Sequence, residues 1–134
     1  MTYLLDTHFI LWAVSDTAKL SKKIKDILAN PDNKIFVSTV SFWEISLKHS
    51  IGKLKLEGGG PEDVPDSCLQ MGFEIEPLSA QDSSSYHKLT ANYHKDPFDR
   101  MLIWQSISNG YNLISADVNI KKYISEGLKI FTDK

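Results

Sequence analysis

The sequence is poor in cysteine. Cys68 is the only cysteine among 134 residues, so no intramolecular disulfide can form. A chain of this length hides enough surface to fold without a cross-link or a structural zinc ion. We read Cys68 as a small buried apolar residue and expect a reducing, cytoplasmic location.

Long apolar runs are also absent. No stretch reaches the roughly 18 apolar residues that cross a bilayer, so the sequence predicts no membrane span. The N-terminal segment MTYLLDTHFILWAV lacks the basic start of a signal peptide, and Asp6 and His8 interrupt its apolar stretch. It is more typical of a buried strand that runs into a helix.

A surplus of positive charge is missing as well. The formal net charge is −2, which by itself does not indicate a nucleic-acid-binding protein. Hydrophobic residues make up 42% and charged residues 24%, as in ordinary globular proteins. There is no internal repeat, low-complexity tail or linker, so we expect one domain over residues 1–134.

The pattern of apolar residues predicts alternating short strands and helices. The predicted strands cover 2–5, 35–37, 73–77, 112–115 and 128–131. The predicted helices cover a stretch after Asp6 and residues 21–30, 38–50, 62–71, 79–89, 97–110 and 118–124. Such alternation favours one α/β domain with a mostly parallel sheet and helices on both faces.

Several carboxylates occupy related places in this layout. Asp6 follows the first strand, and Asp117 lies two residues past the strand at 112–115. Glu44 lies one to two turns into the helix after 35–37, while Asp96 and Asp99 begin the long helix at 97–110. Open α/β sheets bind ligands beyond the carboxyl ends of their strands. The layout therefore places these acids near one edge of the sheet.

The acids also have a purely structural interpretation as helix caps. Aspartate is a preferred N-cap, and Ser41 followed by Glu44 matches a capping box. Asp96 followed by Pro97 is typical of a helix start. Caps alone give no reason for several carboxylates to gather beside apolar residues, where burial is costly without a cation. The two interpretations are compatible, because an aspartate can cap a helix with one oxygen and bind a metal with the other.

An all-carboxylate cluster restricts the choice of metal. Hard oxygen ligands suit Mg²⁺, Mn²⁺ or Ca²⁺, and the sequence has neither EF-hand spacing nor a Cys/His zinc pattern. Two such ions, about 3.5–4 Å apart, activate a water and stabilise the leaving oxygen of an in-line displacement. That chemistry is phosphodiester hydrolysis.

Four segments match a known pattern in the same order and at similar spacing. LLDTH at 4–8, SFWEIS at 41–46, HKDPFDRMLIWQS at 94–106 and LISAD at 113–117 resemble the motifs of PIN-domain ribonucleases, and most of all the VapC-type toxins of type II toxin–antitoxin pairs. The resemblance implies a parallel five-stranded sheet. It also implies an RNA-cleaving site in which Mg²⁺ or Mn²⁺ is held by Asp6, Glu44, Asp99 and Asp117.

The same resemblance implies partners and a secondary site. Family members pair with a small antitoxin that blocks the site, and they commonly form homodimers. Asp96 matches an acid that is frequent in this subgroup. Ser115 stands where threonine is common and can hydrogen-bond a site carboxylate. Arg100 is a candidate partner for a site carboxylate or an RNA phosphate, or else forms a salt bridge that orients its helix.

His8 and His94 are candidate proton carriers, although a two-metal mechanism requires neither. Three other functions are weighed against a toxin. A non-toxin PIN nuclease of RNA processing would share the whole site. A receiver-like signalling domain needs a lysine after a late strand, and the sequence has none at that place. A metal-free interaction domain would use the acids only as helix caps.

Overall fold

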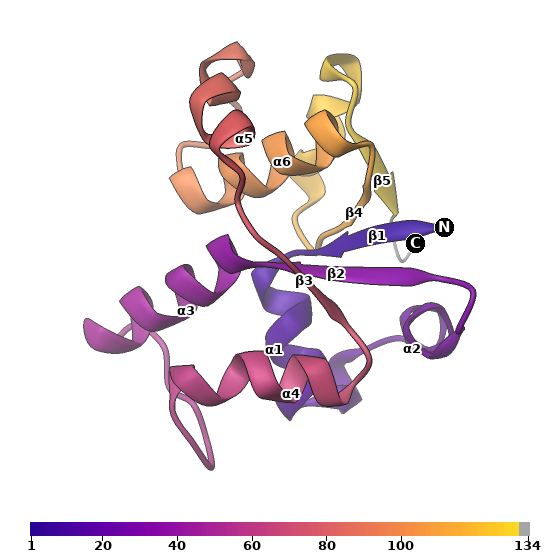
Figure 1. Cartoon of the computed structure of the whole chain (residues 1–134), viewed down its shortest axis with the longest axis vertical. Helices are drawn as coiled ribbons and strands as arrows, with labels where there is room; N and C mark the ends of the chain where they lie inside the picture. The colour runs from indigo at the N-terminus through magenta and orange to yellow at the C-terminus, as the bar shows by residue number, and fades with distance from the viewer. Residues whose placement is uncertain (132–134) are drawn as a thin grey trace.

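A five-stranded parallel sheet forms the centre of the molecule in the computed structural model, which describes residues 1–131 (Figure 1). Residues 132–134, which the predicted domain includes, lie outside the described residues. The strand order is β3-β2-β1-β4-β5, and all four neighbouring pairs are parallel. The strands are β1 (Thr2–Leu5), β2 (Lys34–Ser38), β3 (Glu74–Glu76), β4 (Asn112–Ile114) and β5 (Lys129–Phe131).

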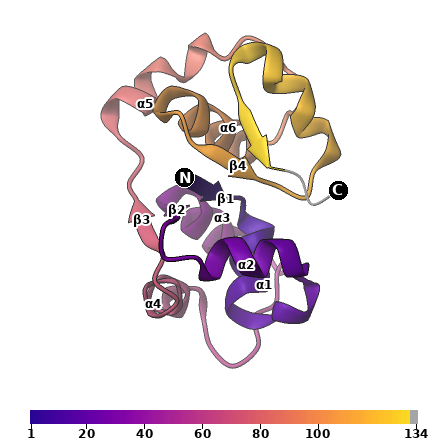
Figure 2. The same ribbon diagram turned by 90° about the vertical axis from the view of Figure 1, so that its right-hand side faces the viewer.

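Helices cover both faces of the sheet (Figures 1 and 2). On one face lie α1 (Thr7–Ser15), α2 (Lys22–Ala29) and α4 (Val64–Gln70). On the other lie α5 (Ala80–Ser85), α6 (Pro97–Asn109) and the 3₁₀ segment η4 (Val118–Glu126). Helix α3 (Thr39–Ser50) extends from the end of β2 and packs against both α1 and α6. Shorter 3₁₀ turns are η1 (Thr17–Lys19), η2 (Pro61–Asp63) and η3 (Tyr86–Lys88).

The two faces of the sheet have separate apolar cores. Leu4 and Leu5 are both fully buried, and they point to opposite faces because side chains alternate along a strand. Leu5 packs in the core with Ile10 of α1, and Leu4 packs in the core with Leu102 of α6. The sheet is therefore held rigidly from both sides, which fixes the edge where its strands end.

The predicted fold class and the five predicted strands are confirmed. Gly110 is the C-cap of α6 and adopts the left-handed conformation (φ 72°) that favours glycine. The predicted helices at 79–89 and 118–124 are partly or wholly 3₁₀. No helix within residues 1–131 is long and apolar enough to cross a bilayer.

The capping box predicted at Ser41 and Glu44 is wrong. Helix α3 begins earlier, and its N-cap is Ser38, whose hydroxyl accepts a hydrogen bond from the Val40 N–H. Ser41 and Glu44 consequently lie inside the helix, where both are buried. Glu44 is free of a capping role, so its burial needs another explanation.

Candidate metal centre

Asp6 lies where β1 ends and α1 begins. Its backbone N–H donates to the Ile114 carbonyl (2.9 Å) and thereby continues the pairing of β1 with β4. Its carboxylate accepts from the Phe9 N–H (3.0 Å), which caps α1, and from the Ala116 N–H (3.2 Å). Burial raises the pKa of Asp6, and these N–H donors offset the rise only in part.

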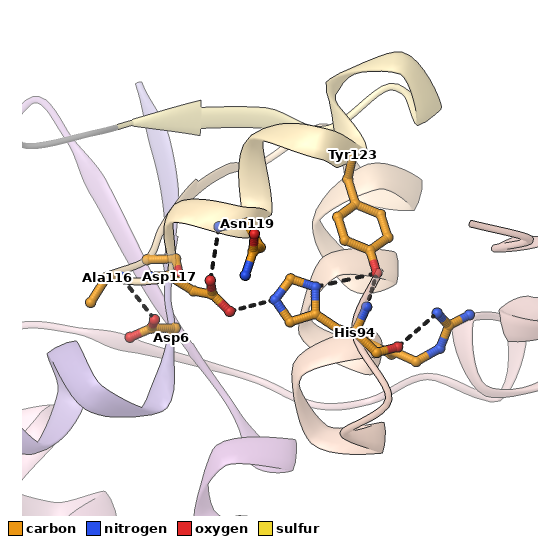
Figure 3. Close-up of polar contacts among 8 residues, drawn as sticks. Asp6, His94, Ala116, Asp117, Asn119 and Tyr123 are labelled. Atoms are coloured by element: carbon orange, nitrogen blue, oxygen red, sulfur yellow. Dashed lines mark hydrogen bonds and ion pairs between the residues drawn. The ribbon is translucent and has the colours of Figure 1, made fainter. Parts of the chain in front are cut away.

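Asp117 follows β4 at the same edge. One oxygen, Oδ1, accepts from the Asn119 N–H (2.8 Å) and caps η4, while Oδ2 meets the Nε2 atom of His94 (Figure 3). The Asp117 N–H donates to the Ser115 hydroxyl (3.1 Å). Partial burial acts to raise the pKa of Asp117, but the hydrogen bonds from Asn119 and His94 outweigh it, and the pKa is lowered.

Glu44 is only 3% exposed and is held by polar side chains from two helices. The Thr7 hydroxyl donates to its Oε1 (2.6 Å) and lies 3.0 Å from the Ser41 hydroxyl oxygen. Lys48 forms an ion pair with its Oε2 one turn further along α3. Burial acts to lower the pKa of Lys48, but the bond to Glu44 and its charge outweigh that effect and raise it. Glu44 is thus a buried carboxylate with one cationic neighbour.

Asp99 differs from the other acids. It lies in the first turn of α6, is half-buried, and accepts no hydrogen bond from any residue in 1–131. Burial, followed by the negative charges of Asp96 and Glu44, raises its pKa from 3.8 to about 6, against a smaller lowering by His94. Asp99 is thus a partly buried carboxylate with acidic neighbours and no hydrogen-bond donor within residues 1–131, and the positive charge near it does not offset the effect of burial.

Three of the four predicted acids line one cavity of about 400 Å³. Its walls combine these acids with apolar residues and a few polar ones: Asp6, His8, Trp12, His94, Asp99, Leu102, Leu113, Ser115, Ala116, Asp117 and Ile120. Asp6, Asp99 and Asp117 therefore gather at the carboxyl edge of the sheet, as predicted. Glu44 lies outside the cavity lining but near enough for its charge to act on Asp99.

The donors at this cavity suit a hard divalent cation. Both oxygens of Asp6 and both of Asp117 accept a hydrogen bond and keep free lone pairs, and neither oxygen of Asp99 accepts a hydrogen bond within residues 1–131. Within the described chain, no three carboxylate, imidazole or thiol groups close into a cage around a single point. Mg²⁺ does not need such a cage, because it keeps several waters and binds through one or two carboxylates.

The secondary residues have different roles. Asp96 caps α6 by accepting from the Phe98 N–H (2.8 Å), as predicted, and its Oδ2 lies 4.0 Å from the Lys48 ammonium. Ser115 lines the cavity and bonds the Asp117 backbone. His8 is exposed at the cavity wall, with its ring 6.0 Å from that of Trp12.

The prediction that Arg100 pairs with a carboxylate is wrong. Its guanidinium contacts no carboxylate within residues 1–131, so neither the site contact nor the predicted salt bridge is present. It donates instead to the Leu89 carbonyl (2.8 Å), the Ala91 carbonyl (2.7 Å) and the Tyr86 hydroxyl (2.7 Å). The side chain points back from α6 to the irregular segment before it, where unpaired carbonyls are the available acceptors.

The sequence indicated His94 only as a candidate proton carrier and did not reveal its contacts with Asp117 and Tyr123. His94 is 9% exposed and lies between Asp117 and the Tyr123 hydroxyl. Its place two residues before Asp96 in the HKDPFDR segment was the only sequence signal for it. Nothing in the sequence singled out Tyr123, because its contact with His94 joins positions 29 residues apart.

The fold and the acidic cavity together define a class: a parallel α/β domain with a carboxylate site beyond the ends of its strands. The sequence model of the PIN domain matches residues 3–124. The chain therefore belongs to the PIN-domain family, a family of nucleases.

Solved structures agree on the fold. The chain is similar to VapBC2 from Rickettsia felis bound to a promoter DNA fragment (19% identity, TM-score 0.70, 98% of both chains). It is also similar to VapBC-1 from nontypeable Haemophilus influenzae (18% identity, TM-score 0.68, 98% of this chain and 97% of the other). A third similar structure is FitAcB from Neisseria gonorrhoeae (16% identity, TM-score 0.60, 97% and 96%). No curated protein matches the sequence.

Proposed function

We propose that this chain is an endoribonuclease that uses Mg²⁺ or Mn²⁺ to hydrolyse RNA phosphodiester bonds. The observation that carries the proposal is the Asp99 carboxylate, which has no hydrogen-bond donor among the described residues and lines the same cavity as Asp6 and Asp117. Membership of the PIN-domain family makes nuclease chemistry the natural use of this cavity. A domain that used its acids only as caps would not need Asp99, which caps no helix.

The metal would be held by Asp6, Asp99 and Asp117, with Glu44 as a further ligand or a ligand through water. When bound, the cation supplies positive charge that activates a water and offsets the charge developing on the phosphate. The chain's own contribution is orientation. Backbone N–H groups of Phe9, Ala116 and Asn119 fix the carboxylates of Asp6 and Asp117 before any ligand arrives.

Lys48 and the apolar walls complete the site. The Lys48 ammonium neutralises Glu44 and lies within 4.0 Å of Asp96, so it limits the repulsion among the acids in the absence of metal. Apolar residues of the wall, such as Leu102 and Leu113, exclude water from the inner side of the cavity and strengthen electrostatic interactions there.

We propose further that the chain is the toxin of a toxin–antitoxin pair that acts in the cytoplasm and is held by a small cognate antitoxin. The support is the fold shared with chains of VapBC and FitAcB structures. Helix α3 and its C-cap residue also expose apolar side chains at every fourth position, Trp43, Leu47 and Ile51, which a protein partner would cover. A homodimer is the second association that we expect. A non-toxin PIN nuclease of RNA processing is the alternative, and growth arrest on expression, relieved by an adjacent small gene, separates the two.

The direct test is cleavage of total RNA by the purified protein with Mg²⁺, with Mn²⁺ and with EDTA. Wild type is compared with Asp99→Asn and with Asp26→Asn, which makes the same chemical change on an exposed acid of α2. We expect discrete fragments from wild type and the control, and none from Asp99→Asn or with EDTA. Equal cleavage by all three proteins, or cleavage that survives EDTA, would refute the metal-nuclease proposal.

A further inference from the structure

Both ring nitrogens of His94, in the cavity wall, have a hydrogen-bond partner. Its backbone N–H donates to the Tyr123 hydroxyl (2.8 Å), and its ring Nδ1 lies 3.3 Å from the same oxygen. Its Nε2 is hydrogen-bonded to Oδ2 of Asp117 (Figure 3). The ring therefore spans from a fully buried tyrosine to a carboxylate of the candidate metal centre.

The hydrogen bonds fix where the ring carries its proton. An ionised carboxylate can only accept, so Nε2 must be the donor to Asp117. In a neutral imidazole, Nδ1 is then an acceptor, and the Tyr123 hydroxyl can donate to it while accepting from the His94 backbone N–H. Every polar atom of the ring has a partner in this arrangement.

The segment that carries His94 is itself anchored to α6. Arg100 donates to the carbonyls of Leu89 and Ala91, and more weakly to that of His94 (3.3 Å). Asp99 precedes Arg100 in the same helical turn. The helix that presents Asp99 thus also sets the position of His94, and through it the position of Asp117.

We propose that His94 is a positioning residue of the metal centre, which holds the Asp117 carboxylate in its metal-binding orientation by donating from Nε2 to Oδ2. The inference rests on the proposed function. The Asp117 side chain is 39% exposed, and the Asn119 N–H restrains only Oδ1. A second donor on Oδ2 fixes the rotation of the carboxylate plane, so that the remaining lone pairs face the cavity.

The test uses two variants of nearly the same shape. His94→Gln keeps an N–H donor near the position of Nε2, whereas His94→Met fills similar space without a donor. Mn²⁺ affinity is measured by titration calorimetry without RNA, next to kcat and KM for RNA cleavage and the midpoint of urea unfolding. We expect the Gln variant to bind Mn²⁺ within about threefold of wild type and the Met variant to lose about 10–100-fold, as is typical when a partner of a metal ligand is removed.

A measurement on the wild type avoids any effect of the variants on folding. Nitrogen-15 NMR of the metal-free protein should show the proton of the His94 ring on Nε2. A ring protonated on Nδ1 alone, or equal Mn²⁺ affinity of the Gln and Met variants, would overturn the positioning role. If wild type binds Mn²⁺ and cuts RNA while the Met variant matches it, only this inference fails. If wild type does neither, the proposed function fails, and the role of His94 fails with it.

Discussion

Replacing Asp99 by asparagine should stabilise the metal-free protein. The rise of the Asp99 pKa from 3.8 to about 6 means that the folded state holds this charge unfavourably. One pKa unit corresponds to about 1.4 kcal/mol, so the rise sets an upper limit of about 3 kcal/mol. Solvent screens this half-exposed group, and Asp99 also favours the positive end of α6, so we expect a net gain of about 1 kcal/mol.

The pH dependence follows from the same shift. Between pH 3.8 and about 6 the folded wild type keeps a proton on Asp99 that the unfolded chain releases, so wild-type stability falls as pH rises through this window. Urea unfolding in EDTA should therefore give nearly equal midpoints for wild type and Asp99→Asn at pH 4, and a higher midpoint for the variant at pH 8. Asp26→Asn, on the exposed face of α2, should leave the free energy of unfolding within about 0.5 kcal/mol of wild type at either pH.

Adding metal should make wild type more stable than Asp99→Asn. Mg²⁺ or Mn²⁺ at ten times its dissociation constant should raise wild-type stability by about 1.4 kcal/mol and leave Asp99→Asn almost unchanged. A variant that is less stable than wild type at pH 8 in EDTA would refute the assignment of unfavourable charge to Asp99. So would a stability difference of the same size at pH 4 and pH 8.

Other contacts give further predictions. Tyr123→Phe leaves the buried His94 N–H without an acceptor and should cost about 1–3 kcal/mol in urea unfolding; an unchanged midpoint would contradict that hydrogen bond. Lys48→Met removes the cation beside Glu44 and should cost about 1.5–3 kcal/mol at pH 8, with part regained when Mg²⁺ is added; a loss that Mg²⁺ does not reduce would separate Glu44 from the metal site. Leu102→Ala opens a cavity in the core and should cost about 2–5 kcal/mol by the same assay. Trp43→Glu places a charge on the exposed face of α3 and should lower the mass measured by light scattering if that face joins two copies.

The pattern of the sequence was enough to predict the strands and the edge where they end. Short apolar runs such as TYLL at β1 are read locally, and a parallel sheet brings the residues after its strands together whatever the details of packing. Asp6 and Asp117 could therefore be placed from the sequence, both as helix caps and as neighbours.

The boundaries and partners of other residues could not be read in this way. The helix predicted at 38–50 agrees with α3, but the use of Ser38 rather than Ser41 as its N-cap depends on where β2 ends, and strand ends are set by the neighbouring strand. Arg100 has five N–H donors that suit carboxylates and carbonyls alike, so only the path of the segment before α6 decides between them.

The sequence by itself determined the fold class and the elements that carry the candidate acids, because these depend on local periodicity and on residue type. Only the tertiary structure decided which acid has a side-chain donor: Glu44 accepts from Lys48, Asp117 accepts from His94, and Asp99 accepts from no group within residues 1–131. The physical reason is that burial and charge act over distance in space, and the chain brings groups from α3, α6 and η4 to one edge only when it is folded.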